Sequence, residues 1–209
     1  MSQSIRRLVP VAFAASMALA ACGTGESVDV DGGGDSTGGG GEAPASGEVI
    51  IAGIAGEPDQ LDPQSTTSYF SFQVLENVFD TLVEPDENLV MQPALAEEWD
   101  VSEDQLTWTF TLRDDVVWHD GSDFTAEDVV YSFNRIIDEN LSNSWRLSAV
   151  TGIEAPDEST VVFTVSSPSP NLLANIGGFK GLAVVQQENV ESGEIGTAPV
   201  GTGPFKVEA

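Results

Sequence analysis

The sequence predicts an α/β protein, because three segments carry the patterns of strands and helices. Apolar residues alternate with polar ones over Leu106–Leu112, which is typical of a half-buried strand. Over Ser68–Leu82 the apolar residues recur every three or four positions, as they do on one face of a helix. The short apolar run at 49–54 is rich in branched residues and predicts a buried strand.

Shorter signals predict the remaining elements. Thr125 is followed three residues later by the acid Asp128, an N-cap pattern that opens a helix. The apolar positions of this helix are Val129, Phe133, Ile136 and Ile137. The other expected elements are a turn at 84–87 that ends the first helix, a strand at 116–118, turns at 119–121 and 154–158, a strand at 161–165, a helix at 170–176, and strands at 184–185 and 205–207.

Composition and charge exclude one class of function. The 209 residues carry 7 Lys and Arg against 34 Asp and Glu, a formal net charge of -27. A chain with this charge repels a nucleic-acid duplex, so no nucleic-acid partner is expected. The apolar fraction of 41 % is too high for a wholly disordered chain and allows one ordinary domain.

The first 21 residues have the layout of a secretory signal peptide. Arg6 and Arg7 precede an apolar run of small residues, Leu8–Ala21, that is too short to span a bilayer permanently. The segment Leu19–Gly23 resembles a bacterial lipobox, which implies cleavage before Cys22 and attachment of lipid to that cysteine. The alternative is ordinary signal cleavage beside an incidental free thiol.

Residues 22–47 are expected to form a flexible tether after the lipidated cysteine. Their composition is dominated by Gly, Ser, Pro and acidic residues, with almost nothing apolar to bury. Asp29, Asp31 and Asp35 suggest a calcium loop, but Gly40 stands where that loop requires a bidentate Glu. We therefore expect neither a metal nor another cofactor.

Seven short segments carry a resemblance to a known family. In chain order they are Leu61–Pro63, Val78–Val83, Pro93–Trp99, Trp108–Arg113, Trp118–Gly121, Phe124–Phe133 with Arg135, and Gly201–Phe205. In order and spacing they resemble the blocks of the peptide/nickel-type (family 5) extracellular solute-binding proteins of ABC transporters. The resemblance covers nearly all of the chain from Val49 onward.

The resemblance implies a bilobal α/β fold of the periplasmic-binding-protein kind, in its three-domain peptide-binding class. Residues 48–63 correspond to a first-lobe strand and loop, 64–168 to the small extra domain, and 169–209 to the return into the first lobe. The second lobe is expected to be missing, as in an N-terminal fragment. Without it, ligand should bind weakly or not at all, because a half-cleft leaves the ligand solvated on one side.

The resemblance also implies a function and a site. Such proteins are not enzymes; they capture oligopeptides, dipeptides, nickel chelates or certain sugars and pass them to ABC permease subunits. A cleft-lining loop falls on Thr67, Ser68 and Tyr69, and a cleft-facing aromatic falls on Trp145. The alternatives are that Tyr69 simply forms the first turn of a helix and that Trp145 is a packing aromatic.

The expected product is a monomer anchored by lipid at Cys22 to the outer face of the bacterial cytoplasmic membrane. Two other functions remain open. A secreted hydrolase could use surface carboxylates, or His119 as the base for a nucleophile. A signalling or adhesion lipoprotein could keep the same fold without transport. No second His or Cys accompanies His119 in the mature fold expected after the tether, so a transition-metal site is not expected there.

Overall fold

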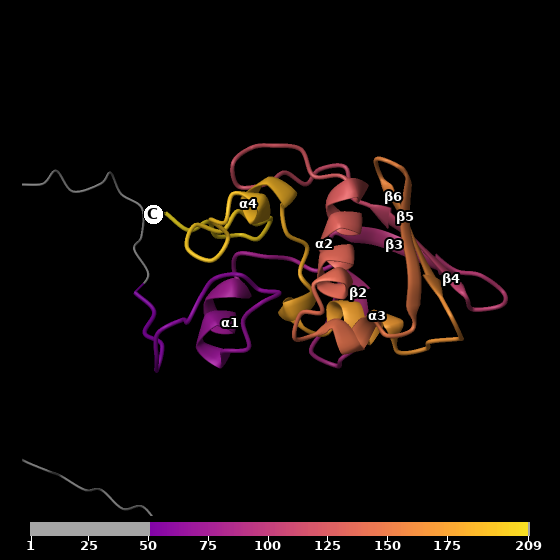
Figure 1. Cartoon of the computed structure of the whole chain (residues 1–209), viewed down its shortest axis with the longest axis horizontal. Coiled ribbons are helices and arrows are strands. Elements are labelled where there is room, and N and C mark those ends of the chain that lie inside the picture. The colour runs from indigo at the N-terminus through magenta and orange to yellow at the C-terminus, as the bar shows by residue number, and fades with distance from the viewer. Residues whose placement is uncertain (1–50, 209) are drawn as a thin grey trace, which may run out of the picture. The chain divides into compact units, whose positions relative to one another are not determined.

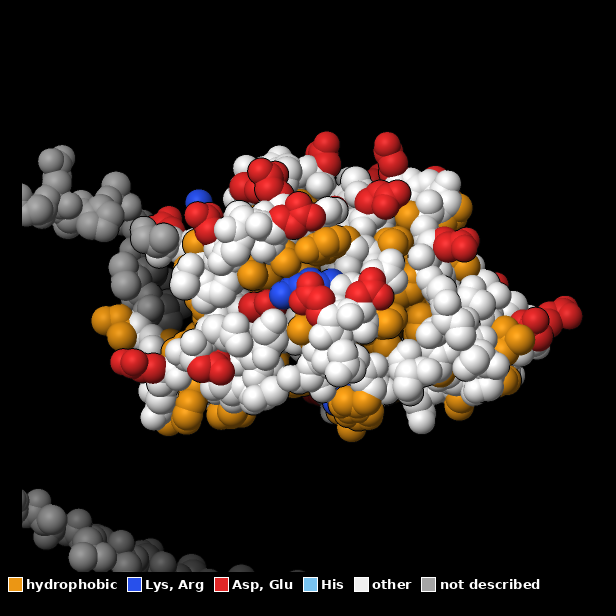
Figure 2. All heavy atoms as spheres, in the orientation of Figure 1, with side chains coloured by type: hydrophobic (Ala, Val, Ile, Leu, Met, Phe, Trp, Pro, Cys, Tyr) orange, Lys and Arg blue, Asp and Glu red, His pale blue; other side chains and the backbone are white. Residues whose placement is uncertain are grey.

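The structure, a computed structural model, describes residues 51–208; the predicted signal peptide, Cys22 and the tether lie outside them. A four-stranded antiparallel sheet has the order β3-β4-β6-β5 (Figure 1). Its strands are β3 (Ala96–Val101), β4 (Thr107–Leu112), β5 (Val150–Asp157) and β6 (Thr160–Val165). On the face drawn in Figure 2, acidic side chains are scattered widely and basic ones are few.

The strand predicted from the alternating pattern is confirmed as β4. Trp108, Phe110 and Leu112 are buried, whereas the threonines between them are partly exposed. The partner strand β6 places Phe163 opposite Trp108 and Val161 opposite Phe110. Because side chains alternate between the two faces of a strand, these apolar residues all face one side of the sheet.

Helix α2 (Ala126–Asp138) lies beside the sheet (Figure 1), and its buried residues share one hydrophobic core with Trp108, Phe110 and Phe163. Its predicted start is confirmed, since the Asp128 carboxylate accepts a hydrogen bond from the Thr125 N–H at 2.9 Å. Val129, Phe133 and Ile136 are buried against the sheet. The helix therefore adds its apolar stripe to the core of the sheet.

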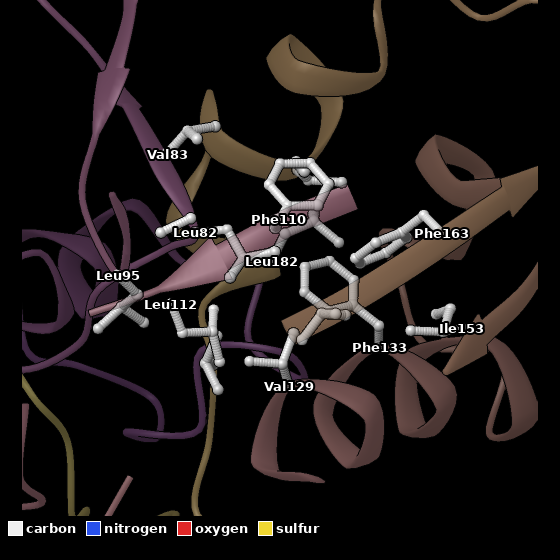
Figure 3. Close-up of a cluster of buried hydrophobic side chains, with 14 of the residues drawn as sticks. Leu82, Val83, Leu95, Phe110, Leu112, Val129, Phe133, Ile153, Phe163 and Leu182 are labelled. Carbon is white, nitrogen blue, oxygen red and sulfur yellow. The ribbon is translucent and has the colours of Figure 1, made fainter. Parts of the chain in front are cut away.

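Three phenylalanine rings join α2 to the sheet (Figure 3). The rings of Phe110 and Phe163 have centroids 5.5 Å apart at 74°, and those of Phe133 and Phe163 are 5.1 Å apart at 85°. Both pairs have the edge-to-face arrangement that aromatic side chains prefer. This trio forms the centre of the larger hydrophobic core.

Helix α1 (Tyr69–Leu75) is shorter than predicted, although the apolar positions of its pattern are buried. The chain leaves the helix at Glu76, and the carbonyls of Asn77 and Val78 accept hydrogen bonds from the N–H groups of Phe205 and Gly203. A distant segment thus uses backbone groups that a longer helix would have occupied. Phe72 and Phe79 still pack into a second, smaller core.

A small hairpin and further helices complete the described chain. The hairpin pairs β1 (Val83–Pro85) with β2 (Met91–Pro93), so the turn expected at 84–87 begins later, at Asp86. The Asp86 carboxylate accepts hydrogen bonds from the N–H groups of Asn88 and Val90 and so closes this turn. The predicted helix at 170–176 is confirmed as α3 (Leu172–Gly177), and the sequence pattern missed α4 (Gln187–Glu191).

The strand predicted over 49–54 is wrong in the part that the structure describes. Residues 51–54 have no strand conformation, and Ile51 is exposed. No strand within residues 51–208 pairs with this segment. An apolar run without a neighbouring strand cannot satisfy its backbone groups in a sheet. Its apolar composition alone was therefore not sufficient to predict a strand.

Four other short predictions also differ from the structure. Residues 154–157 belong to β5, and the turn follows them; residues 205–207 form no strand. Val117 makes only an isolated bridge with Asp123. Val184 and Val185 are buried but form no strand, because their N–H groups donate to the Asp80 carbonyl and the Ser132 hydroxyl. Between residues 51 and 208, no helix has both the length and the apolar character that a membrane crossing requires.

Candidate ligand-binding surface

The loop that leads into α1 is held in place by its own polar side chains. Asp59 Oδ1 accepts hydrogen bonds from Ser71 Oγ at 2.6 Å and from Thr66 Oγ1 at 2.7 Å. These hydroxyls, Ser71 first, hold the pKa of Asp59 below its ordinary value. Thr66 Oγ1 in turn accepts the N–H of Ser68 at 3.0 Å. The backbone on both sides of Thr67 is therefore fixed.

A buried ion pair connects this loop to α2. Arg135 Nη2 lies 2.7 Å from Asp62 Oδ2, and Nη1 lies 3.3 Å from Oδ1, with side chains only 8 % and 5 % exposed. Nη1 also donates to Gln64 Oε1 at 3.0 Å. The Gln64 amide then donates to the carbonyls of Ser132 and Ala183. Three segments far apart in the sequence meet at this network.

We expect the Asp62–Arg135 pair to make stability depend on acid pH. Burial alone would raise the pKa of Asp62, but the hydrogen bonds and charge of Arg135, with the Ser65 hydroxyl, lower it below its ordinary value. A carboxyl whose pKa is lowered by folding stabilises the folded state at pH values above its unfolded pKa, about 3.9. This stabilisation is lost as the pH falls through the folded pKa. Urea unfolding from pH 7 to pH 2.5 should show it.

The Asp62→Asn variant isolates this contribution from those of the other carboxylates. It should be less stable than the parent chain at pH 7, and its free energy of unfolding should fall less steeply below about pH 4. Equal slopes for the two proteins would show that Asp62 does not have the lowered pKa.

The structure exposes most of the residues that the family resemblance assigned to the cleft. Thr67 is exposed, Ser68 is partly buried at the N-cap of α1, and Tyr69 is the first residue of that helix with 72 % of its surface exposed. Trp145 lies in a 3-10 helix, η1 (Ser144–Leu147), and is 63 % exposed. Trp145 therefore does not pack in the core, and Tyr69 is both a first-turn residue and a surface residue.

A series of side chains in contact leads from Trp145 to helix α1. The Arg146 guanidinium carbon lies 4.7 Å from the centroid of the Trp145 ring and 5.3 Å from that of Phe179. The Phe179 ring lies 4.6 Å from the ring of Phe72, which belongs to α1. The two predicted positions, Tyr69 and Trp145, are thus carried by elements that pack on a common aromatic group.

A hollow of about 410 Å³ opens beside this aromatic group. It is lined by Phe179, by the end of α3 and by charged side chains near the end of α1. Lys180, in the 3-10 helix η2 (Lys180–Leu182), forms ion pairs there with Asp80 at 3.8 Å and with Glu84. The hollow combines an apolar wall with both signs of charge, as small-molecule sites do.

Sequence reasoning did not single out Arg146 and Phe179, the two residues that connect Trp145 to Phe72. Phe179 follows α3 outside any periodic pattern, and Arg146 is one of few basic residues but stands in no recognisable motif. The one available signal, which concerned Arg146 alone, was the scarcity of basic residues, since each Lys or Arg of such an acidic chain is a candidate for a specific role. Their proximity depends on how η1 and the segment after α3 come together.

His119 has a structural role. Its Nε2 lies 2.7 Å from the Gly203 carbonyl and must carry the proton, because a carbonyl can only accept. Its Nδ1 accepts the N–H of Gly201 at 3.2 Å. Both ring nitrogens are therefore occupied by backbone groups of one loop. This arrangement leaves neither nitrogen free to take a proton from a nucleophile, against the hydrolase hypothesis that used His119 as base.

A methyl group at Gly201 should destabilise this part of the fold. A Cβ there would lie 1.9 Å from the Val78 carbonyl oxygen, so backbone must move. We expect Gly201→Ala to lower the free energy of unfolding by about 1–3 kcal/mol, the usual range for overpacking. Gly196 is the matched control, since a Cβ there meets nothing within 4 Å. Urea unfolding followed by tryptophan fluorescence measures both variants, and equal stability would contradict the close approach.

Within residues 51–208, no group of three or more His, Cys, Asp and Glu side chains is arranged to hold a metal ion. The carboxylates of this part are used elsewhere: several of them cap turns, as Asp86 does, or pair with Arg and Lys. The described contacts of Trp145 are with the Arg146 guanidinium, which also reaches Phe179, and the charged hollow lies beside Phe179.

Comparisons with known proteins place this geometry in a family. A family model described as bacterial extracellular solute-binding proteins, family 5 Middle, matches residues 90–209. Protein XP55 of Streptomyces lividans is 36 % identical over 199 residues, which is 93 % of this chain and 34 % of XP55. The periplasmic murein peptide-binding protein MppA of Escherichia coli is 33 % identical over 183 residues, 76 % of this chain and 33 % of MppA.

A solved structure agrees with these relatives. The periplasmic binding protein DppA of Helicobacter pylori, in complex with the peptide STSA, matches with a TM-score of 0.64 and 31 % identity, over 72 % of this chain and 34 % of DppA. The chain spans about a third of the length of the relatives it matches. The α/β periplasmic-binding-protein fold expected from the sequence is confirmed for this part. The chain belongs to the family 5 bacterial extracellular solute-binding proteins.

Proposed function

We propose that the protein is the lipid-anchored, substrate-binding component of an ABC importer and delivers peptides or similar small solutes to membrane permease subunits. The observation that carries this proposal is the family match over residues 90–209. The printed names of the relatives support a peptide class of ligand, since they include a murein peptide-binding protein and a structure with the peptide STSA bound. A monomer outside the cytoplasm fits the same role.

The proposed ligand surface comprises the exposed residues Thr67, Tyr69 and Trp145 and the partly buried Ser68. Support comes from the exposure of Tyr69 and Trp145, because a large aromatic side chain held in solvent offers a ligand a large apolar contact area. In this proposal residues 48–63 and 169–209 belong to the first lobe and 64–168 to the extra domain. A second lobe would cover the ligand from the other side and raise the affinity.

The proposed anchor is Cys22, the only cysteine of the chain. Cells fed a palmitate analogue should label the wild-type protein, and the Cys22→Ala variant should lose the label and leave the membrane fraction. The charge of -27 gives no electrostatic attraction to anionic lipid, so lipid must supply the attachment. Equal labelling of the two proteins would overturn the anchor.

Transport is tested separately from anchoring. Deletion of the encoding gene should reduce uptake of a radiolabelled tripeptide such as trialanine, and the wild-type gene should restore it. The Trp145→Ala variant should restore less uptake than Val117→Ala, a control substitution at an exposed apolar residue outside the proposed surface. If deletion leaves uptake unchanged while the wild-type protein is labelled at Cys22, the result would instead favour the signalling or adhesion lipoprotein.

A further inference from the structure

Arg146 differs from the other arginines of the described chain. Arg113 and Arg135 each hold a carboxylate with two hydrogen bonds, and Lys180 pairs with Asp80 and Glu84. Within residues 51–208, no carboxylate lies within 4 Å of the Arg146 guanidinium. In a chain with 34 acidic residues, an arginine that lies over two aromatic rings and pairs with no described acid calls for an explanation.

The surroundings of Arg146 fix the position of its guanidinium. The group lies over the rings of Trp145 and Phe179, at 4.7 and 5.3 Å from their centroids. Its Nε is buried and has no hydrogen-bond partner within residues 51–208. The backbone is also held, because the Arg146 N–H donates to the Asn143 carbonyl and the Arg146 carbonyl accepts from the Asn175 amide. The guanidinium is thus oriented without using its charge on a carboxylate of the described chain.

This arrangement has a chemical preference. A guanidinium stacked on aromatic rings keeps its planar edge free for two parallel hydrogen bonds, and a carboxylate matches that edge in shape and charge. We propose that Arg146 binds a carboxylate of the ligand and that the surface beside Trp145 selects solutes carrying one, such as the C-terminus or an acidic side chain of a peptide. The inference rests on the proposed function and names the ligand class at the same surface.

The net charge of the protein makes this selectivity a local effect. A chain of charge -27 repels anions on average, so any preference for a carboxylate must come from a nearby cation. Lys180 is the other cation beside Phe179, but Asp80 and Glu84 already pair with it. Arg146 is the cation of this surface that no described acid neutralises.

A matched pair of probes tests the proposal on the 209-residue chain. N-acetyl-L-alanine and N-acetyl-L-alaninamide differ only in the carboxylate, and both can be added at millimolar concentration with ¹H–¹⁵N spectra recorded. The acid should shift the Arg146 Nε–H and Trp145 indole signals in a saturable way. The amide should bind at least about tenfold more weakly than the acid. The Trp118 indole, which is buried, is the internal control.

Two variants assign the preference to Arg146. Arg146→Gln should bind acid and amide equally weakly, and Arg146→Lys should keep part of the preference because it keeps the charge but not the planar edge. Equal binding of acid and amide by the parent chain would overturn the carboxylate inference while leaving solute binding intact. A preference that survives in Arg146→Gln would also overturn it. Absence of any shift from both probes, even at the millimolar concentrations at which weak binding by a half-cleft still registers, would count against the proposed ligand surface itself.

Discussion

Replacing Arg135 by Met should lower the free energy of unfolding by about 3–5 kcal/mol, the usual result of removing one partner of a buried ion pair. The variant leaves the Asp62 carboxylate, 5 % exposed, without its cation, and Gln64 loses a donor to its carbonyl oxygen. Methionine keeps most of the side-chain volume, so a cavity contributes little to the change. Urea unfolding at pH 7, followed by circular dichroism, measures the loss.

The exposed ion pair of the same protein is the matched control. Arg113 also gives Asp115 two hydrogen bonds, from Nε and Nη2, where Arg135 uses Nη1 and Nη2. The side chains of Arg113 and Asp115, however, are 45 % and 62 % exposed. Arg113→Met should therefore cost less than about 1 kcal/mol. Similar losses for the two variants would show that burial of the Arg135 pair does not determine its effect.

Phe133→Ala should lower the free energy of unfolding by about 3–5 kcal/mol, as large-to-small substitutions of buried aromatic residues do. The Phe133 ring is fully buried and packs edge-on against Phe163, which also touches Phe110. Its removal leaves a cavity between α2 and the sheet and deletes an aromatic contact (Figure 3). Thermal and urea unfolding should agree on the loss.

Ile137 provides the control on the same helix. It follows the same apolar pattern in the sequence but is 37 % exposed in the structure. Ile137→Ala should cost about 1 kcal/mol or less, because only part of its side chain leaves water on folding. A loss as large as that of Phe133→Ala would place Ile137 inside the core and contradict the orientation of α2.

The elements that could be predicted from the sequence are those whose patterns are local. Strand β4 follows from the alternation in Leu106–Leu112, and the start of α2 from Thr125 and Asp128 three residues apart. Each signal lies within one turn or one strand, so no distant residue is needed to interpret it. The family blocks extended the prediction to the fold as a whole.

The failures share a physical cause, namely partners that lie far away in the sequence. Helix α1 stops early because Gly203 and Phe205 take the carbonyls of Val78 and Asn77. Val184 and Val185 form no strand because other segments take their N–H groups. The contact of Arg146 with Phe179 likewise joins two segments whose proximity no local pattern encodes.

The loop that holds Asp62 and Gln64 comes early in the described chain, whereas its partners follow much later in the sequence. Arg135 is 73 residues beyond Asp62, and the Ala183 carbonyl that accepts from Gln64 is 119 residues beyond it. The four-stranded sheet and α2 are complete by Val165. Contacts between distant residues require large loops to close and therefore form late. The sheet and its helix can assemble during synthesis, before the Ala183 carbonyl that accepts from Gln64 has been made. The hydrogen bond from Gln64 to the Ala183 carbonyl thus forms only after the sheet and α2 have been synthesised.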